Sequence, residues 1–228
     1  MRMFDVILVM AGSGSRTGLS YNKVLYPVKN KPLFRYSLDQ FLALPQCRKV
    51  ILVAGERDFS AVEEATSDLD GDRIKIAIGG SRRRESVYNG LVLTESDLVL
   101  SHDAARPLIK KEDIIKVYEA ANDGGFAVLA VKATDTIYRV RGDEMKILDR
   151  GELWHMQTPQ AVARSALLAA YESDSPDLER ATDEVGLIIK KFDIKPIIVE
   201  GSHDNIKVTY ERDLRFVEYM IERGYYGL

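Results

Sequence analysis

A glycine-rich segment near the start of the chain carries two cations that could bind phosphate. Residues 10–23 read MAGSGSRTGLSYNK and follow directly on the apolar run 6–9. A dinucleotide fingerprint requires G-x-G-x-x-G and a P-loop requires G-x-x-x-x-G-K-[ST], and neither spacing is present. What remains is a small-residue turn whose N–H groups can approach an anion, with Arg16 and Lys23 to neutralise charge. This combination suits a triphosphate better than a dinucleotide; the alternative is a surface loop with solvated cations.

A run of three arginines follows another strand-like segment. Residues 79–87 read GGSRRRESV. Ser81 is of a type that caps helices, but arginines at 82–84 in the first helical turn would oppose the helix dipole. An exposed basic helix start is therefore the plain interpretation, although one of these arginines and Ser86 can still face a nucleotide.

The segment SHDAARP at residues 101–107 places charged side chains at the end of a further strand. A carboxylate at Asp103 can hold a divalent cation or a substrate hydroxyl, and Arg106 can orient a sugar phosphate. The alternative is a structural turn closed by an Asp–Arg pair. We expect His102 to be a packed turn residue and assign it no catalytic role.

Three other segments carry weaker signals. The only tryptophan stands in LWHMQTPQ at 153–160, where the QTPQ end predicts a loop before a helix. Thr182-Asp183 reads most simply as a helix N-cap. EGSHDNIKVT at 200–209 follows the last predicted strand and brings Lys207 to the same sheet edge as the first loop. A lysine there is a candidate for charge stabilisation in phosphoryl chemistry.

These polar segments alternate with apolar runs that should position them. Most of the runs are apolar at consecutive positions, as buried parallel strands are, and helical periodicity lies between them. The alternation predicts an α/β fold, a doubly wound and mostly parallel sheet that binds ligands at the carboxyl ends of its strands. The expected strands are 6–9, 49–54, 73–78, 97–100, 126–131 and 196–199, and the expected helices begin behind Pro32, near Ile114 and near Leu214.

Residues 132–152 do not fit this alternation. They contain strand-like pieces around a Gly142-Asp143 turn, but too few apolar residues for a hairpin in the core. One interpretation is a long surface hairpin. The other is an arm that leaves the domain and packs on a second subunit, since long excursions from a compact domain are uncommon and often functional.

Composition narrows the classes of partner and compartment. The chain has 228 residues, a length that suits one large domain or two small ones, and a net charge of −3. That charge gives no general attraction to nucleic acid or to an anionic membrane surface, and no stretch approaches the length of a membrane span. The single Cys47 excludes an internal disulfide and a cysteine zinc site, so a reducing cytoplasm is the expected location.

Taken together and in this order, the motifs resemble those of the 2-C-methyl-D-erythritol 4-phosphate cytidylyltransferase family. The resemblance runs over residues 5–222 and rests on AGSGSR…NK, GGSRRRESV, HDAARP, DT at 135–136, DRGELWHMQTPQ, TDE and EGSHDNIKVT. It implies a single Rossmann-like nucleotidyltransferase domain over 1–228, with 132–152 as a dimerisation arm. It also implies that CMP is transferred from CTP to methylerythritol phosphate, with Mg²⁺ as cofactor and pyrophosphate as the second product.

The resemblance also implies roles for individual residues. Three cations would act in catalysis, at Arg16, Lys23 and Lys207. The nucleotide would be bound by Ala11, Gly12, Gly14, Gly80, Ser81, Ser86 and Asp103, with Asp103 also near the metal. Substrate would be bound by Arg106, which with Asp103 faces its hydroxyls, and by Thr136, Arg150 and Thr182 at its phosphate, in a site shared across a homodimer.

The chain departs from the family pattern at two places. Asn22 stands where a proline commonly precedes the catalytic lysine, which leaves open how rigidly Lys23 is presented. Ser81 stands where an acidic residue is frequent. The rival activities are a ribitol 5-phosphate cytidylyltransferase, whose members tend to carry a bulkier residue than Ala105, and a non-catalytic nucleotide-binding dimer.

Overall fold

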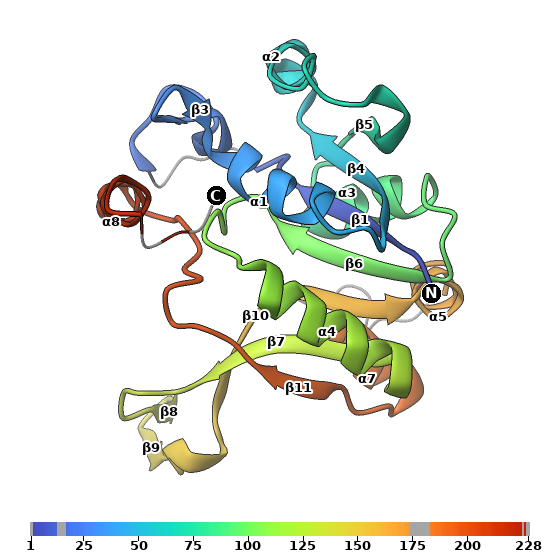
Figure 1. Ribbon diagram of the computed structural model, residues 1–228. Coiled ribbons are helices and arrows are strands. Elements are labelled where there is room, and N and C mark those ends of the chain that lie inside the picture. The colour runs from blue at the N-terminus through green and yellow to red at the C-terminus, as the bar shows by residue number, and fades with distance from the viewer. Residues whose placement is uncertain (1, 13–16, 174–182, 225, 227–228) are drawn as a thin grey trace.

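A seven-stranded sheet forms the centre of the molecule (Figure 1). The structure is a computed structural model that describes residues 2–12, 17–173, 183–224 and 226. The strand order is β11-β7-β10-β6-β1-β4-β5, and every neighbouring pair is parallel except those that involve β10. The strands are β1 Phe4–Val9, β4 Cys47–Ala54, β5 Ile74–Ile78, β6 Leu98–Asp103, β7 Phe126–Lys132, β10 Trp154–Ala163 and β11 Ile197–Glu200.

The six predicted strands are confirmed, and β10 is the one that sequence reasoning missed. Residues 153–160 were expected to end in a loop before a helix, which is wrong, because β10 lies antiparallel between β6 and β7. Pro159 has no N–H to donate to a sheet ladder, so a proline argues against a central strand. Here the register against β7 shifts between Met156 and Gln160, and the proline falls in that irregularity.

Helices cover both faces of the sheet and bury it on each side. On one face Phe34, Leu38 and Val117 pack with the side chains of β1 and β4, and on the other Val87, Leu167 and Ile188 do the same. The first face carries α1 Leu33–Leu42, α2 Phe59–Glu64 and α4 Lys111–Gly124, and the second carries α3 Arg83–Leu91, α5 Arg164–Tyr171 and α7 Glu184–Phe192. The doubly wound α/β fold is therefore confirmed.

A third apolar cluster attaches the last helix to an early segment of the chain. Leu214, Val217 and Ile221 of α8 (Glu211–Glu222) pack against Val28 and Tyr36. The short elements between β1 and β6 are η2 Lys23–Leu25, β2 Pro27–Val28, β3 Lys31–Pro32, η3 Glu56–Asp58 and η4 Gly71–Arg73. Among the described residues, no helix has the length and apolar character needed to cross a membrane.

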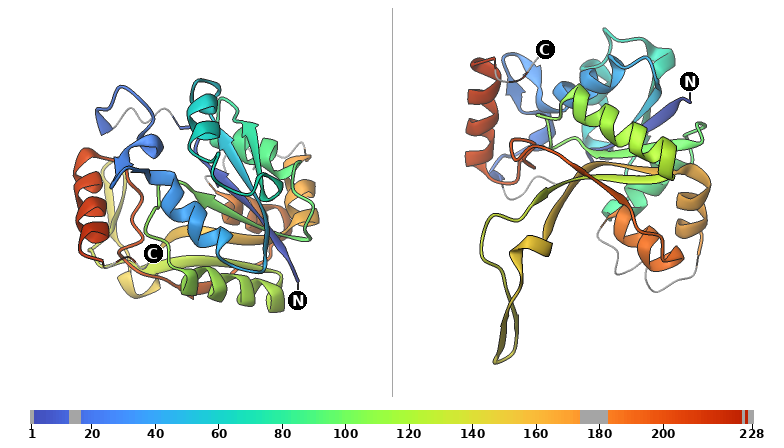
Figure 2. Two further views of the ribbon diagram at one scale, coloured as in Figure 1. Left: turned by 45° about the horizontal axis from the view of Figure 1, so that its top comes forward. Right: turned by 60° about the horizontal axis from the view of Figure 1, so that its bottom comes forward.

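The polar segment 132–152 forms a hairpin that projects away from the sheet (Figure 2, right). Its strands β8 (Tyr138–Arg141) and β9 (Glu144–Ile147) pair so that Arg141 faces Glu144 across the predicted Gly142-Asp143 turn. Gly142 has φ 57°, the left-handed backbone that two-residue hairpin turns favour. The short η5, Arg150–Glu152, leads from the hairpin back to β10.

The hairpin has one apolar face that no described part of the chain covers. The register pairs Tyr138 with Ile147 and Val140 with Met145, so these four side chains share one face. All four are exposed, Met145 to 66% of its surface. Arginine, lysine and glutamate side chains occupy the other face.

Candidate active site

A cleft of about 560 Å³ lies at the carboxyl ends of β1 and β6. The glycine-rich loop, η2, the start of α3 and the segment after β11 all contribute to its lining. This is the edge at which a doubly wound sheet binds ligands. Of the residues expected in the site, the cleft brings together Ala11, Gly12, Lys23, Gly80, Ser81, Ser86, Asp103 and Lys207. Gly14, Arg16 and Thr182 lie outside the described residues.

Lys23 begins η2, and Asn22 caps that turn. The Asn22 side-chain oxygen accepts from the backbone N–H of Val24 at 3.3 Å, and its amide nitrogen donates to the Met10 carbonyl at 2.7 Å. Both neighbours of Lys23 in the chain are buried: Asn22 is 1% exposed and Val24 is 3% exposed. The residue that replaces the family's proline is therefore held by hydrogen bonds.

The turn before α3 is closed by Glu85. One of its carboxylate oxygens, Oε2, accepts from the Ser81 N–H and hydroxyl, both at 2.8 Å, and from the Arg82 N–H at 3.3 Å. Ser81 does not cap the helix; Arg82 is the N-cap residue. The negative charge of Glu85 in the first turn offsets the unfavourable placement of arginines there. A Cβ on Gly80 would lie 2.3 Å from the Cβ of Glu85, so the turn requires glycine.

Arg83 turns inward, so the expectation of a solvated basic helix start is wrong for this arginine. It pairs with Glu184 at 2.6 Å and with Asp103 at 3.4 Å. Glu184 is 1% exposed and also accepts from the Ser101 hydroxyl at 2.6 Å. Sequence reasoning assigned no role to Glu184, because only the fold brings the start of α7 next to the start of α3.

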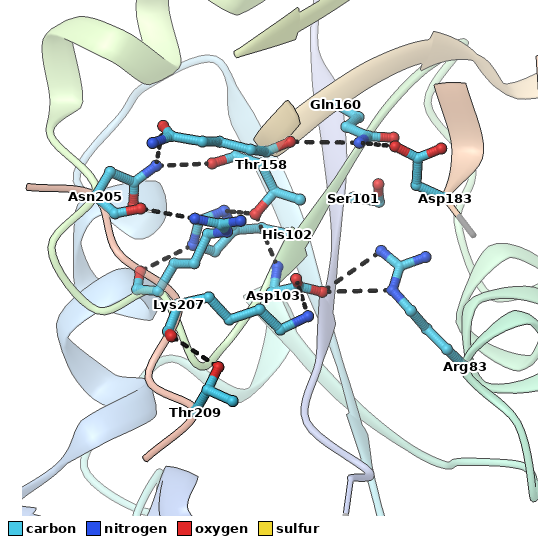
Figure 3. Close-up of polar contacts among 12 residues, drawn as sticks. Arg83, Ser101, His102, Asp103, Thr158, Gln160, Asp183, Asn205, Lys207 and Thr209 are labelled. Atoms are coloured by element: carbon cyan, nitrogen blue, oxygen red, sulfur yellow. Dashed lines mark hydrogen bonds and ion pairs between the residues drawn. The ribbon is translucent and has the colours of Figure 1, made fainter. Parts of the chain in front are cut away.

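Asp103 and Lys207 form an ion pair at the edge of the cleft. The Lys207 Nζ lies 2.7 Å from the Asp103 Oδ2, and Arg83 approaches the other carboxylate oxygen (Figure 3). Burial alone would raise the pKa of Asp103, but the charges of Arg83 and Lys207 hold it well below its usual value. Asp103 is therefore a carboxylate at any working pH.

His102 is packed, as expected, but it lies within β6 and not in a turn. Its Nε2 donates to the Arg106 carbonyl at 3.1 Å, because a carbonyl can only accept, so its Nδ1 accepts from the Thr158 hydroxyl at 2.9 Å. Burial lowers the pKa of His102 to about 4, which keeps the ring neutral. The Thr158 oxygen in turn accepts from the Asp103 N–H at 3.1 Å and so holds the end of β6.

Arg106 lies beside the cleft and not in its lining. Its Nη1 donates to the Asn205 carbonyl at 2.7 Å, and the Asn205 amide donates to Gln157 and Thr158. These bonds join the loops after β6 and β11 to β10. A role for Arg106 at a substrate hydroxyl stays a prediction.

Thr136 and Arg150 lie on the arm and line a separate hollow there with Ile147, Leu148 and Asp149. Arg150 donates to the Thr134 carbonyl at 2.7 Å. A single chain therefore does not bring these two predicted substrate-phosphate ligands into the cleft with Lys23 and Asp103.

The described residues that line the cleft do not build a site for a resident metal ion. The described residues contain no group of three His, Cys, Asp or Glu side chains that could hold one. Asp103 contributes one carboxylate, whose two oxygens are already paired with Lys207 and Arg83. A cation such as Mg²⁺ prefers several oxygen ligands, which this arrangement lacks.

Solved structures with the same architecture define the class. The 4-diphosphocytidyl-2C-methyl-D-erythritol synthase of Anaerococcus prevotii superposes with a TM-score of 0.84 at 27% identity, over 97% of this chain and 99% of that one. The 2-C-methyl-D-erythritol 4-phosphate cytidylyltransferase of Francisella tularensis gives 0.79 at 30% identity, over 95% and 99%. The chain thus has the α/β nucleotidyltransferase fold.

Sequence comparison identifies the family within that class. Residues 4–223 match the family model of 2-C-methyl-D-erythritol 4-phosphate cytidylyltransferase, and the chain belongs to this family of enzymes. The relative from Bacillus velezensis is 35% identical over 218 residues, which cover 94% of each chain. The chloroplastic relative from Oryza sativa is 38% identical over 221 residues, covering 95% of this chain and 74% of that protein.

Proposed function

We propose that the cleft transfers CMP from CTP to the phosphate of 2-C-methyl-D-erythritol 4-phosphate and releases pyrophosphate. A phosphate oxygen of the acceptor attacks the α-phosphorus of CTP in line, and the bond from that phosphorus to the pyrophosphate oxygen breaks. The observation that carries the proposal is a cleft lined by Lys23, Lys207 and Asp103 in a chain of this family.

Positioning and charge neutralisation supply most of the rate in such a transfer. We assign the triphosphate and the developing pyrophosphate to Lys23 and Arg16, and the α-phosphate and attacking phosphate to Lys207. Lys207 must then exchange Asp103 for phosphate oxygens. Asp103 keeps Arg83 as a partner during that exchange, and it is free to accept from a hydroxyl of the acceptor beside Arg106.

The glycine loop and the turn before α3 bind the nucleoside in this proposal. The backbone groups of Ala11, Gly12, Gly14 and Gly80 approach it closely, together with the Ser86 hydroxyl. The Ser81 hydroxyl proton is committed to the Glu85 carboxylate, so the lone pairs of its oxygen are left to accept from a donor such as the cytosine amino group. Ser81 can thus read the base although it is not acidic.

The arm completes the site in a homodimer. The single domain over 1–228 would pair through residues 132–152, because the exposed apolar face of the hairpin requires a covering surface. Thr136 and Arg150 of one chain, with Thr182, would then bind the acceptor phosphate in the cleft of the other. Their separation from the cleft within one chain supports this arrangement.

Magnesium enters this proposal as part of the substrate, since Mg²⁺ binds nucleotide phosphates with few protein ligands. Asp103, the carboxylate in the described lining of the cleft, would be the side chain to approach such an ion. Neither a nucleic-acid partner nor a membrane surface is needed, and the single buried Cys47 suits a reducing cytoplasm.

The test of the activity is pyrophosphate release from CTP with two acceptors measured side by side. Methylerythritol phosphate is expected to support turnover and ribitol 5-phosphate is not. Turnover with ribitol phosphate alone would favour the rival cytidylyltransferase, and CTP binding without turnover would favour a non-catalytic dimer.

The shared site has its own test in mixed dimers. Lys23→Ala and Arg150→Ala chains are each expected to be inactive as homodimers. Mixed and reassociated, they should regain activity at the sites built from one intact cleft and one intact arm. Heterodimers that form without regaining activity refute the shared site.

A further inference from the structure

A buried hydrogen bond joins the turn that carries Lys23, in the cleft lining, to η3, which lies outside that lining. The Asn22 Nδ2, which also donates to the Met10 carbonyl, donates to the Asp58 Oδ2 at 2.8 Å. Asn22 is 1% exposed and Asp58 6% exposed, so both side chains are largely shielded from water. The two residues are 36 positions apart in the chain.

The hydrogen-bond partners of Asn22 lie on two segments that contact the start of η2. Met10 directly follows β1, and Asp58 ends η3 beyond the carboxyl end of β4, the strand that pairs with β1. The bonds of Asn22 therefore fix η2 to two adjacent strand ends. Lys23 follows Asn22 in the chain and lines the cleft.

The side chain of Asp58 faces away from the helix that follows it. Asp58 is the last residue of η3 and has helical backbone angles, so α2 continues from η3 without a side-chain cap. The carboxylate faces Asn22, with the Arg57 guanidinium at 3.6 Å. The Asp58 carboxylate therefore holds the turn that carries Lys23 and makes no capping bond to α2.

We infer that Asn22 and Asp58 are positioning residues that present Lys23 to the triphosphate of CTP. This inference rests on the role proposed for Lys23. A polar bridge to β1 and η3 fixes the backbone at Lys23 in the place where a proline would restrict it. The lysine can then meet the developing charge on the leaving pyrophosphate with little reorganisation.

Removing either partner is expected to lower kcat more than it alters binding of the acceptor. A catalytic group displaced by about 1 Å can cost on the order of 100-fold in rate, so Asn22→Ala and Asp58→Ala should each lower kcat by about 10- to 100-fold. KM for methylerythritol phosphate should change by less than about threefold, because Lys23 is assigned to the triphosphate. Asp58→Ala keeps the hydrogen bonds of Asn22 to Met10 and Val24, so this variant should be more stable than Asn22→Ala.

A polarity swap separates positioning from loss of packing. Asn22→Asp places a second carboxylate against Asp58, and its kcat should fall further at pH 8 than at pH 6, since facing carboxylates share a proton more readily at low pH. The double variant Asn22→Asp/Asp58→Asn restores one donor to the pair and should recover kcat about tenfold over Asn22→Asp. A purely structural pair would move the melting temperature and leave the kcat of the folded enzyme unchanged.

Asp70→Ala is the matched control. Asp70 caps the short η4 through the Asp72 N–H at 3.0 Å, the same kind of bond as that from Asn22 to Val24, and it lies outside the cleft lining. Its kcat should equal that of the unmodified enzyme. If Lys23→Ala is inactive while Asn22→Ala and Asp58→Ala keep full kcat, the positioning inference is wrong and the proposed role of Lys23 stands. If Lys23→Ala itself keeps full activity, the proposed role of Lys23 is wrong.

Discussion

Two buried aspartates occupy opposite ends of adjacent strands, and their partners differ in kind. Asp5, near the start of β1, is fully buried and accepts from the N–H groups of Glu95 and Ser96, the Ser96 hydroxyl and the Arg48 guanidinium. Two of these donors are backbone groups, which cannot rotate away. Burial alone would raise the pKa of Asp5, but these hydrogen bonds lower it below its usual value.

Asp103, at the end of β6, has one partner that can leave. Its carboxylate pairs with the flexible end of Lys207, whose side chain is 41% exposed, and at the longer distance of 3.4 Å with Arg83, which Glu184 holds in place. A buried carboxylate thus lies at each end of the parallel strands, but only at the carboxyl ends can a ligand replace one of its partners. The comparison separates a carboxylate that stabilises the fold from one that is available for chemistry.

The largest expected effect is on activity, at the carboxyl ends. Asp103→Asn should lower kcat/KM by about 100- to 1000-fold, because it removes an acceptor for the substrate and a charge that orients Lys207. Asp103 is buried, so the free energy of unfolding should fall as well, but by less than for Asp5→Asn, since Lys207 can be solvated and Arg83 keeps Glu184. Steady-state kinetics and urea unfolding on the same preparation check both parts. A large loss of stability at this position would erase the contrast with Asp5.

The corresponding substitution at Asp5 should lower stability and leave kcat unchanged. Asp5→Asn leaves Arg48 with only the exposed Glu95 as a charged partner and is expected to cost about 3 kcal/mol, the low end for a broken buried pair, because Arg48 keeps Glu95 and some contact with water. The kcat of the folded fraction should not change. Urea unfolding measures the first effect, and active-site-normalised turnover below the unfolding transition measures the second. A change in kcat would show that the two ends of the sheet are coupled.

The same contrast explains how much the sequence could predict. Six strands of the central sheet could be predicted because each is an apolar run, which can be recognised from the local sequence. β10 could not, because Pro159 and its polar neighbours do not form such a run, and antiparallel pairing on both sides compensates for this only in the folded sheet.

Site residues divide in a similar way. Asp103, Lys23 and Lys207 could be proposed because charged residues directly follow or approach strand ends, and family resemblance added their roles. The pairs Arg83–Glu184 and Asn22–Asp58 could not, since 101 and 36 residues separate their members and no spacing rule relates them. Only the packing of the helices and strand ends brings them together.

Acid should lower stability through His102 and through Asp5 in different pH ranges. His102, beside Asp103, has its pKa lowered by burial from 6.5 to about 4, so the unfolded chain binds more protons than the folded one between these values. Stability should therefore fall by about 2 kcal/mol from pH 7 to pH 5. The contribution of Asp5, whose pKa is also lowered, is present above its unfolded value near 3.8 and is lost only below it. Urea unfolding of His102→Gln should show a flatter dependence between pH 7 and 5, and an unchanged slope would assign the loss to other groups.

The smallest expected effects come from the hydroxyls that support each carboxylate. Ser96→Ala removes a donor to Asp5 at 3.0 Å and should cost about 1 kcal/mol with kcat unchanged, because the backbone donors remain. Thr158→Val removes the oxygen that accepts from the Asp103 N–H and should cost a similar amount. Thr158→Val should also lower kcat several-fold, since it loosens the strand end that carries Asp103. Equal kcat in the two variants would mean that the end of β6 holds Asp103 without Thr158, and that the difference between the two aspartates lies only in their charged partners.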